Sequence, residues 1–580
     1  MFQRTSSVSA LLACTILTFL SSAIATELQV GKAQEGTLTN GKAVGYTLPL
    51  KAGDFVQANV DRRETELIIT IYAPSGEKFR AFRIDPDYTS QIVFIAPDAG
   101  QYRLDVAGTE GSKSGSYSIV VTKIVPMQQR MSPPPVPQPE SPRIKQLNAD
   151  LNAGKPNALA DFWQEVKTRT TPLIEPIEGD SQYALATFLW QGNSATQDVV
   201  VVWFPYVRGW PDDFRMVRLG ETNVWYKTLR INRQERTVYR LAPNAGFLHA
   251  SRNRDQEQIT MLMAGSQTDP LNPRHWLHDP VKPDNPKYQD WSAYEMPDAP
   301  KQPWAEKRPG VPEGSVERQA FKSSLLNNER DLYVYLPAGY SAKNPQPYGL
   351  IVLFDGTAYV QGRFGPPLIP GSTTLDNLIA AKRIPPVVAL LIDNPPGTRD
   401  DELACRTKFL EALNREMVPW VRENYNVTRD PHNTLVGGLS FGGLSAACAA
   451  LYYPQTFGNV LAQSGGFAFT PPKDDNPLEF KNNPDEQPNW MAQQFIASQR
   501  LPVRFFLTAG TDEVDPSGRG QDILTSSRNL RDVLLAKGYE VHYEEFYGGH
   551  DFLSWRGSLA DGLIDLLGNA KAEQTTAQKR

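Results

Sequence analysis

Hydrophobic and polar positions alternate in short runs along the first part of the chain, from about residue 28 to residue 123. Examples are residues 46–50, 67–72 and 117–121, and turn-forming Gly, Pro, Asp and Ser residues separate the runs. Short alternating strands at this spacing are typical of an all-β sandwich. We therefore predict a β-sandwich domain over residues 26–124.

Prolines crowd into the next stretch, residues 125–143. A proline-rich segment favours extended polyproline and acts as a semi-rigid spacer. The sequence therefore predicts a linker here.

The alternating pattern returns in residues 144–304, after a helix that we predict near residues 158–167. The strands that the pattern predicts are residues 183–190, 199–204, 224–229 and 238–241. They indicate a second sandwich. Its irregular end, with DPLNPRHW at 269–276 and WSAYEMPDAP at 291–300, either caps a core or lines a groove facing the next domain.

Continuous apolar runs replace the alternation in residues 305–568. The clearest runs are residues 349–354, 387–392 and 504–508, and amphipathic helices are predicted at 409–425 and 525–537. Continuous apolar runs are typical of parallel strands buried on both faces. We predict a doubly wound α/β domain, followed by a polar tail at residues 569–580.

Composition excludes some classes of function. The chain has 580 residues, a net charge of -5 and a pI near 5.9. A net-acidic surface argues against general nucleic-acid binding, which needs basic patches. The length indicates several domains.

The first 25 residues have the pattern of a signal peptide. Arg4 precedes an apolar run at residues 10–20, and Ala23-Ile24-Ala25 resembles a cleavage site. The run is shorter than the ~20 residues that span a bilayer. We expect a periplasmic or secreted protein with no stable membrane insertion after cleavage. Lipidation at Cys14 is the alternative.

Two cysteines follow the predicted signal, Cys405 and Cys448. They allow at most one disulfide and no cysteine-based metal cluster. We expect Cys448, on a predicted helix, to be a small buried side chain rather than a reactive thiol.

The segment GLSFG at residues 438–442 lies between a predicted strand at 433–437 and a helix rich in small residues at 443–451. A G-x-S-x-G motif in this context is typical of the nucleophile elbow of an α/β-hydrolase. Glycines flank the serine because a Cβ there would clash with the tight turn. We predict Ser440 as the nucleophile. The predicted fold is thus two β-sandwiches followed by an α/β-hydrolase catalytic domain.

A serine nucleophile needs a base that a third group orients, and in this fold the chain order is Ser, acid, His. Only His542 and His550 follow Ser440. His542 lies within an alternating strand, where we expect it on one sheet face. His550 lies in the loop GGHD after that strand, so we predict it as the base.

The acid is expected after the strand at residues 504–508. Asp512, Glu513 and Asp515 are the candidates. The usual spacing selects Glu513, and Asp512 is the main alternative.

The oxyanion hole needs two backbone N–H donors. We predict one from Phe441 and the other from Gly356 or Thr357, in the loop after the strand at 349–354. Of the nearby arginines, Arg399, Arg406 and Arg556 either meet an anionic substrate or are ordinary surface charges.

The leading region resembles a known module. IYAPSG at residues 71–76 and AGQYRL at 99–104 are similar to the pre-peptidase C-terminal type β-sandwich. The resemblance implies a non-catalytic module of secreted bacterial enzymes, with a docking or stabilising role.

Residues 144–567 resemble the enterochelin (ferric enterobactin) esterase family. The similarity is carried by GLSFGGLSA at 438–446, LAQSG at 461–465, GGHD at 548–551, and by WRGSL at 555–559 with GLIDL at 562–566. The irregular stretches at 269–276 and 295–300 also resemble the family's amino-terminal domain.

The resemblance implies hydrolysis of ferric enterobactin, a cyclic tri-serine lactone with three catecholates. Ser440 matches the family's nucleophile, His550 its base and Glu513 its acid. The iron belongs to the substrate, so no protein-bound metal or other cofactor is implied. Because the ferric complex is triply negative, we place Arg399, Trp555 and Arg556 at the mouth as substrate-binding residues.

The chain departs from the family in its predicted signal and leading sandwich. Two-domain members of this type are generally cytoplasmic, which keeps the cytoplasm as the alternative location. Two alternative functions also stay open: a general secreted serine esterase or acyltransferase, and a non-catalytic periplasmic siderophore-binding protein.

Overall fold

The computed structural model describes most of the chain, in residues 26–38, 43–63, 66–84, 91–109, 115–130, 137–203, 211–246, 256–276, 290–360, 367–395, 397–471, 489–514 and 522–568. The predicted signal peptide with Cys14, the polar tail at 569–580 and Asp515 lie outside the described residues.

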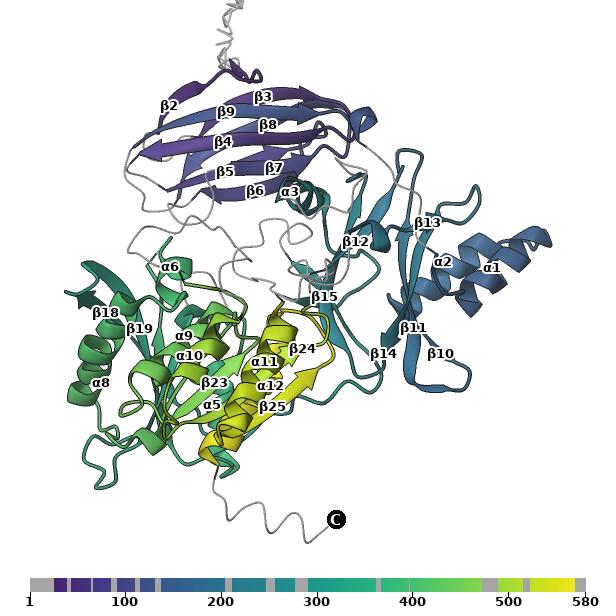
Figure 1. Ribbon diagram of the computed structural model, residues 1–580. Coiled ribbons are helices and arrows are strands. Elements are labelled where there is room, and N and C mark those ends of the chain that lie inside the picture. Colours follow the sequence, from purple (N-terminus) through teal and green to yellow (C-terminus); the bar gives the residue numbers. More distant parts are fainter. Residues whose placement is uncertain are drawn as a thin grey trace, which may run out of the picture.

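The leading region is a pair of β-sheets packed face to face (Figure 1). One sheet has the order β1 (Thr26–Glu27), β3 (Val44–Leu50), β8 (Gly100–Gly108), β5 (Leu67–Tyr72), β6 (Lys78–Ile84). The other has the order β2 (Gln34–Leu38), β9 (Gly115–Val125), β4 (Phe55–Arg63), β7 (Gln91–Ile95). Alternate residues such as Leu48, Ile69 and Ile119 fill the space between them. The three predicted strands are confirmed.

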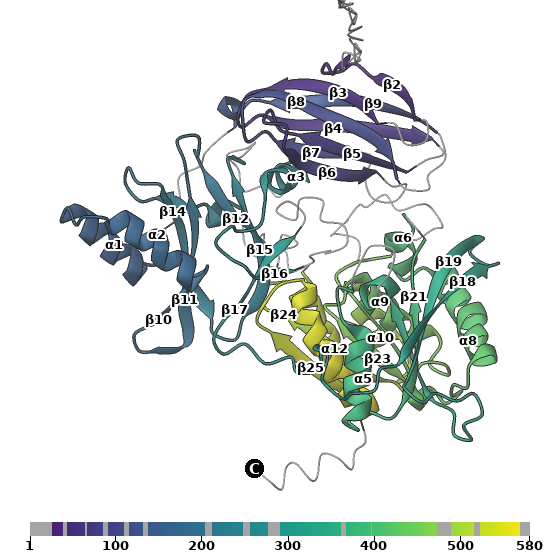
Figure 2. The ribbon, with the colours of Figure 1, turned by 180° about the vertical axis from the view of Figure 1, so that it is seen from behind.

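The second region also contains two four-stranded sheets, next to the first region (Figure 2). Their strand orders are β10 (Leu173–Ile177), β11 (Asp180–Gln191), β14 (Val224–Asn232), β13 (Val217–Arg218), and β12 (Val199–Trp203), β15 (Arg236–Pro243), β17 (Trp291–Glu295), β16 (His275–Trp276). The helices are α1 (Pro142–Asn152), α2 (Ala158–Arg169) and α3 (Gln256–Gly265), with the short η2 (Pro211–Phe214). The sequence predicted α2 and missed α1.

The described ends of the proline-rich stretch contact the neighbouring regions, while the linker itself stays a prediction. Arg130, after η1 (Met127–Gln129), is buried and donates to the carbonyls of Asn244 at 3.0 Å and Ala245 at 2.6 Å, and also to Gly53 O. At the other end, Ser141 caps helix α1. A buried guanidinium needs hydrogen-bond acceptors, and carbonyls of both sandwiches accept from its two terminal nitrogens here.

The hydrophobic core continues from one sandwich into the other. Phe55 and Ile95 of the leading sandwich share a cluster with Tyr239 and Leu241 of β15. Arg80 also crosses, donating to Ser266 O at 3.2 Å. The two sandwiches are therefore docked by burial, while their boundaries as separate domains stay a prediction.

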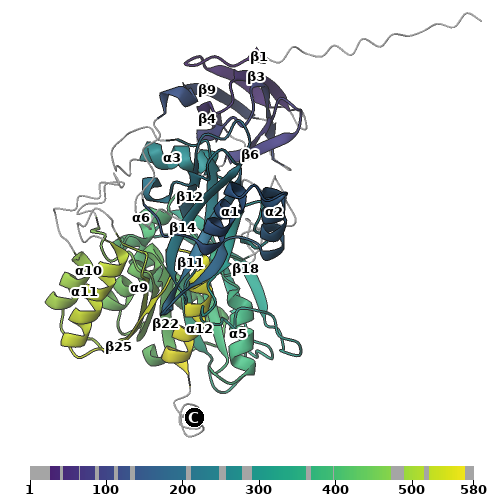
Figure 3. The ribbon, with the colours of Figure 1, turned by 90° about the vertical axis from the view of Figure 1, so that its right-hand side faces the viewer.

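The last region is an eight-stranded sheet with helices on both faces (Figure 3). Its order is β18 (Ser315–Ser323), β19 (Asn328–Leu336), β21 (Val387–Ile392), β20 (Gly349–Phe354), β22 (Thr434–Leu439), β23 (Asn459–Gln463), β24 (Arg504–Gly510), β25 (Glu540–Phe546). Strands β20 to β25 run parallel. The three apolar runs from which parallel strands were predicted are β20, β21 and β24. The antiparallel β18 and β19 were not predicted.

The helices around this sheet are α5 (Gly371–Ala380), α6 (Arg399–Leu403), α7 (Thr407–Ala412), α8 (Val418–Asn424), α9 (Phe441–Tyr452), α10 (Trp490–Ala497), α11 (Ile523–Ala536) and α12 (Phe552–Leu567). The helix predicted at 409–425 is α7 and α8 joined by a π-helical turn, η4 (Leu413–Met417). Two further short turns are η3 (Gly356–Ala358) and η5 (Pro431–Asn433).

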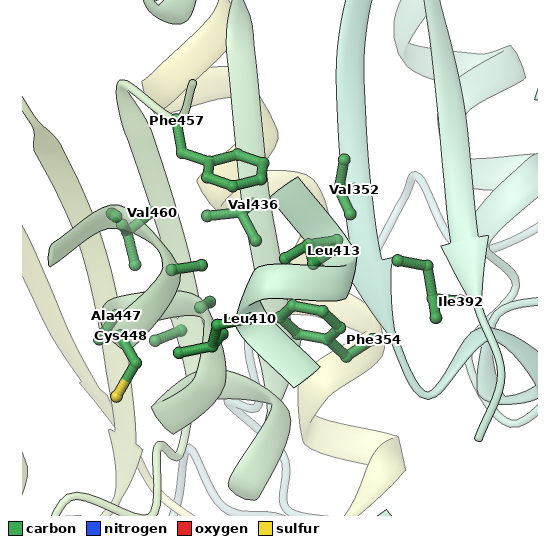
Figure 4. Close-up of a cluster of buried hydrophobic side chains, with 14 of the residues drawn as sticks. Val352, Phe354, Ile392, Leu410, Leu413, Val436, Ala447, Cys448, Phe457 and Val460 are labelled. Carbon is green, nitrogen blue, oxygen red and sulfur yellow. The ribbon is translucent and has the colours of Figure 1, made fainter. Parts of the chain in front are cut away.

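Apolar side chains lock the middle of this sheet to its helices. Figure 4 shows Val352, Phe354 and Val436 of the strands against Leu410 and Leu413. Cys448 of α9 lies beside this cluster and forms a disulfide with Cys405, after α6. It is therefore buried, as predicted, and is disulfide-bonded. Such packing fixes where each strand ends, and the candidate site lies at those ends.

Candidate active site

Ser440 stands at a sharp turn between β22 and α9. Its φ is +56°, a left-handed conformation that a serine rarely adopts. A Cβ on Gly438 would lie 2.7 Å from the carbonyl carbon of Gly442, so only glycine fits there. The Ser440 N–H donates to Gln463 O at 2.9 Å. The strained turn is the geometry predicted from G-x-S-x-G.

The structure brings His550 and Glu513 together. The Nδ1 atom of His550 lies 2.5 Å from Oε1 of Glu513, whose side chain is fully buried. The other carboxylate oxygen of Glu513 accepts the Gly510 N–H at 2.6 Å. The backbone N–H of Asp512, the alternative acid, donates to Gly548 O at 3.1 Å. Of these two candidates, Glu513 is the hydrogen-bond partner of the imidazole.

Sheet register carries these residues to one edge. Leu439 pairs with Gln463, Gln463 with Thr508, and Gly510 with Phe546. The strands are parallel, so Ser440, Glu513 and His550 all follow carboxyl ends at the same edge of the sheet. This is the edge where open α/β sheets bind ligands.

The loop after β20 is the predicted second half of the oxyanion hole. Gly356 and Thr357 form the short turn η3, which begins after Asp355 with a φ of +59°. A Cβ on Gly356 would lie 2.8 Å from the backbone of Leu391, so the loop approaches β21 closely. The Thr357 hydroxyl donates to Asp393 at 3.2 Å. Burial raises the pKa of Asp393 to about 6.

Ser440, Glu513 and His550 thus follow strands at one edge of the sheet, and comparisons with known proteins identify the type of enzyme. Residues 185–305 match the family Enterochelin esterase, N-terminal, and residues 323–566 match the family Esterase. The iron(III) enterobactin esterase of Escherichia coli is 30% identical over 397 residues, covering 66% of this chain and 90% of that protein. The chain belongs to the enterobactin esterase family.

Further matches describe the same relationship. The iron(III) enterobactin esterase of Dickeya dadantii is 29% identical over 439 residues, covering 70% of this chain and 92% of that protein. The crystal structure of the Shigella flexneri enterobactin esterase in the presence of enterobactin has a TM-score of 0.53 and 26% identity, covering 70% of this chain and 97% of that one. The present esterase is thus a carboxylic ester hydrolase with an α/β-hydrolase-type fold.

The prediction that Trp555 lies at the mouth of the site is wrong. Trp555 is 1% exposed and lies edge-on against His550, with ring centroids 4.6 Å apart. Its indole N–H donates to Ser464 at 2.9 Å. Helix α12 already begins at Phe552, so Trp555 falls on the face that packs against the sheet. Its place is behind the imidazole and away from solvent.

Arg556 does not stand at an open mouth either. Its guanidinium carbon lies 4.9 Å from the Trp276 ring, and it forms an ion pair with Glu295 at 3.6 Å. It also donates to Gln302. These partners belong to the second sandwich and its connector, so Arg556 serves the interface between the two regions.

Arg399 lies at the oxyanion loop and is already paired. Its guanidinium donates to both oxygens of Asp355, at 2.5 and 2.8 Å. Burial lowers the pKa of Arg399, but the Asp355 charge more than offsets this and keeps it above its usual value. Arg406 pairs with Asp401 at 3.2 Å. Arg399 therefore holds Asp355, at the start of the loop that carries Gly356.

The predicted irregular stretches face the next domain. Trp291 packs in one cluster with Val238 and with Leu553 of helix α12. Residues 275–276 and 291–295 are regular strands rather than irregular chain. They present the second sandwich to the start of α12.

One residue that the sequence reasoning missed is Asp551, the neighbour of His550. Its carboxylate caps helix α12 by accepting the Ser554 N–H at 3.0 Å, and it also accepts the Thr237 hydroxyl at 2.7 Å. An Asp before a predicted helix is a capping signal. No sequence pattern near Asp551 predicts its contact with Thr237, which is 314 residues away.

The other described histidines do not join the site. His542 lies on β25, as predicted, and pairs with Asp565 at 2.7 Å and Glu544 at 2.9 Å. Within the described ranges, no group of three or more His, Cys, Asp or Glu side chains is placed to hold a metal ion. A search of the same residues finds no helix with the length and apolarity to cross a membrane.

A cavity of about 170 Å³ lies between the second sandwich, the connector and helix α12. Its lining includes Arg236, Gln302, Thr508, Ser554 and Asp561. Ser440, Glu513 and His550 do not line it. It is therefore an interface cavity and not the place of ester chemistry.

Proposed function

We propose that this esterase hydrolyses the serine ester bonds of ferric enterobactin or a related catecholate siderophore, and so assists iron release. The observation that carries the proposal is the hydrogen bond from His550 to Glu513 at the same sheet edge as the strained Ser440. The names of the relatives, which are iron(III) enterobactin esterases, support the substrate.

In the proposed reaction, Glu513 accepts the N–H of Nδ1 and leaves Nε2 of His550 free to accept a proton. His550 takes the proton of Ser440 while the serine oxygen bonds to the lactone carbonyl carbon. The backbone N–H groups of Phe441 and of Gly356 or Thr357 stabilise the oxyanion.

Collapse of the tetrahedral intermediate breaks the ester bond of the macrocycle. The leaving seryl oxygen takes the proton from His550, and a linear acyl-enzyme remains. Water then gives a proton to His550, attacks the acyl carbon and releases the free acid, which restores the Ser440 hydroxyl. The iron stays with the catecholates of the substrate throughout.

Recognition of a triply negative complex by an acidic protein requires local positive charge. Arg399 is the most exposed of the three predicted substrate-binding residues, with 35% of its side chain exposed. Its charge is shared with Asp355, so we infer that the substrate competes with, or adds to, that pair. Arg399→Ala is then expected to raise KM and to disturb the oxyanion loop.

Chromatography of the reaction products tests the function. The purified protein is incubated with ferric and with iron-free enterobactin, and samples are separated over time. Linear trimer, dimer and monomer are the expected products, and their order shows how far the enzyme cuts. Binding without cleavage would establish the siderophore-binding alternative. Cleavage of a neutral aryl ester alone would establish the general esterase.

We further propose that the protein acts outside the cytoplasm, with residues 1–25 as an export signal. The Cys405–Cys448 disulfide supports this, because such bonds persist in oxidising compartments. A periplasmic enzyme would linearise the siderophore before it crosses the inner membrane. Cell fractionation with mass spectrometry of the mature N-terminus tests the location, and intact cytoplasmic chains would contradict it.

A further inference from the structure

The loop that carries His550, residues 547–551, is held by a strand of the second sandwich. The Arg236 N–H donates to Tyr547 O at 3.3 Å, and the Thr237 hydroxyl donates to Asp551 at 2.7 Å. Both donors lie on β15, which lies beside helix α12 (Figure 2). The hydrolase sheet supplies the loop, and the sandwich holds it at both ends.

Asp551 is the buried link in this arrangement. It is 1% exposed, and its two oxygens have separate partners: Oδ1 accepts from Ser554 of its own helix and Oδ2 accepts from Thr237. A buried carboxylate needs such donors, since an unpaired one is costly. Loss of the Thr237 hydroxyl therefore leaves Oδ2 without this donor, directly beside the peptide unit of His550.

We propose that Thr237 is a positioning residue for His550 and acts through Asp551. This role rests on the proposed function, because it assumes that His550 is the base. Glu513 fixes one end of the imidazole, while Asp551 fixes the backbone from which the ring projects. Proton transfer is sensitive to small displacements of the base, so a loop that relaxes slows the chemical step more than it weakens substrate binding.

Because charged groups surround Asp551, the proposed role of Thr237 predicts a change in the pH dependence of kcat. The charged groups that face it are Glu513, His550, Arg236 and Arg556. Burial raises the pKa of Asp551 to about 7, and the Thr237 hydroxyl and the Ser554 N–H oppose that rise by favouring the ionised form. Removal of the hydroxyl raises the pKa further, so the ionised carboxylate forms only at higher pH.

The test uses the full-length protein with Thr237→Val, Thr237→Ser and a matched control, Thr228→Val. Thr228 is a buried residue of the same sandwich whose hydroxyl bonds that of Thr187 at 3.1 Å. The substrates are ferric enterobactin and a neutral chromogenic aryl ester. For Thr237→Val we expect kcat to fall on the order of tenfold, the factor that one hydrogen bond of ordinary strength supplies. KM stays within about twofold, because the substrate-binding groups are untouched.

The pH profile and the conservative variant separate positioning from a merely structural effect. The acid limb of kcat moves upward by about half a unit to one unit in Thr237→Val. Thr237→Ser restores both kcat and the profile, and Thr228→Val keeps them even where its melting temperature falls. Combining Thr237→Val with Asp551→Asn gives less than the product of the single effects, because the two residues act as a unit.

Wild-type kcat and an unshifted acid limb in Thr237→Val would overturn the proposal, as would an equal loss in Thr228→Val. Thr237→Ala, which adds no bulk, repeats the test if the valine variant does not fold. A wild-type protein that cleaves neither ester would contradict the proposed function itself, and this role with it.

Discussion

The two halves of the candidate site are held in different ways. Ser440 is fixed from within the hydrolase domain, by the close approach of Gly438 to Gly442 and by helix α9, which the Cys405–Cys448 disulfide ties to the segment after α6. The loop of His550 is held from two sides: Glu513 of the hydrolase domain bonds the imidazole, and Arg236 and Thr237 of the second sandwich bond the backbone and Asp551. The proposed nucleophile therefore depends on one domain, while the proposed base also has contacts across an interface.

The second sandwich contacts the hydrolase domain at the start of helix α12. Its strand β17 packs Trp291 against Leu553, and Gln302 of the connector donates to Leu553 O at 2.9 Å. The leading sandwich is one step further away and contacts the second sandwich through Phe55, Ile95 and Arg130. We therefore expect substitutions near α12 to change the catalytic rate, and substitutions near Arg130 to change mainly the free energy of unfolding.

The largest expected effect comes from the contact between Glu513 and His550. Glu513→Gln is expected to lower kcat by about 10²–10⁴-fold, because the amide can donate to Nδ1 and so favours the wrong imidazole tautomer. The matched control is Asp512→Asn, next to it in the chain, for which we expect less than a threefold change. Steady-state kinetics on the aryl ester measures both. The opposite pattern would show that Asp512 is the acid.

Removal of the Cys405–Cys448 disulfide tests how the region around Ser440 is stabilised. Cys405→Ala with Cys448→Ala is expected to cost about 3–4 kcal/mol of stability for a bond that closes this length of chain. The turn at Ser440 is built by glycine contacts, so kcat per folded molecule should change little. Thermal unfolding with and without a thiol reductant measures the cost. An equal melting temperature of the wild-type protein with and without the reductant would contradict the presence of the disulfide.

The smallest effect concerns the junction of the two sandwiches. Arg130→Ala leaves three carbonyls, two of them in buried hydrogen bonds, without their charged donor and is expected to cost about 2 kcal/mol. Arg83→Ala removes an exposed pair with Glu66 and is the control, with a cost of about 0–1 kcal/mol. Denaturant unfolding compares them. A large loss of kcat in Arg130→Ala would mean that the leading sandwich reaches the active site.

Local patterns predicted the elements whose chemistry is local. Strands β20, β21 and β24 were visible as apolar runs, and Ser440, Glu513 and His550 each follow a predicted strand within a few residues. Helix α1 was missed although Ser141 and Pro142 mark its start, and it buries only Ile144 and Leu147. Edge strand β18 carries few apolar residues, and of these only Phe321 is buried, so no apolar run marks it.

Long-range contacts account for the wrong predictions in the site. Trp555 and Arg556 were predicted at the mouth of the site from the charge of the substrate, whereas α12 begins early enough to bury the first and turn the second toward Trp276. The partner of Asp551 lies on a strand 314 residues earlier. No pattern within a short window contains such a contact, so the dependence of His550 on the sandwich needed the structure.

The most direct measurement is product formation from ferric enterobactin by wild-type and Ser440→Ala protein, with binding of the intact complex measured on the same samples. The account predicts linear products from the wild-type protein, a loss of kcat of at least about 10³-fold in the variant, and a dissociation constant that changes little. Continued cleavage by Ser440→Ala at a comparable rate would contradict it.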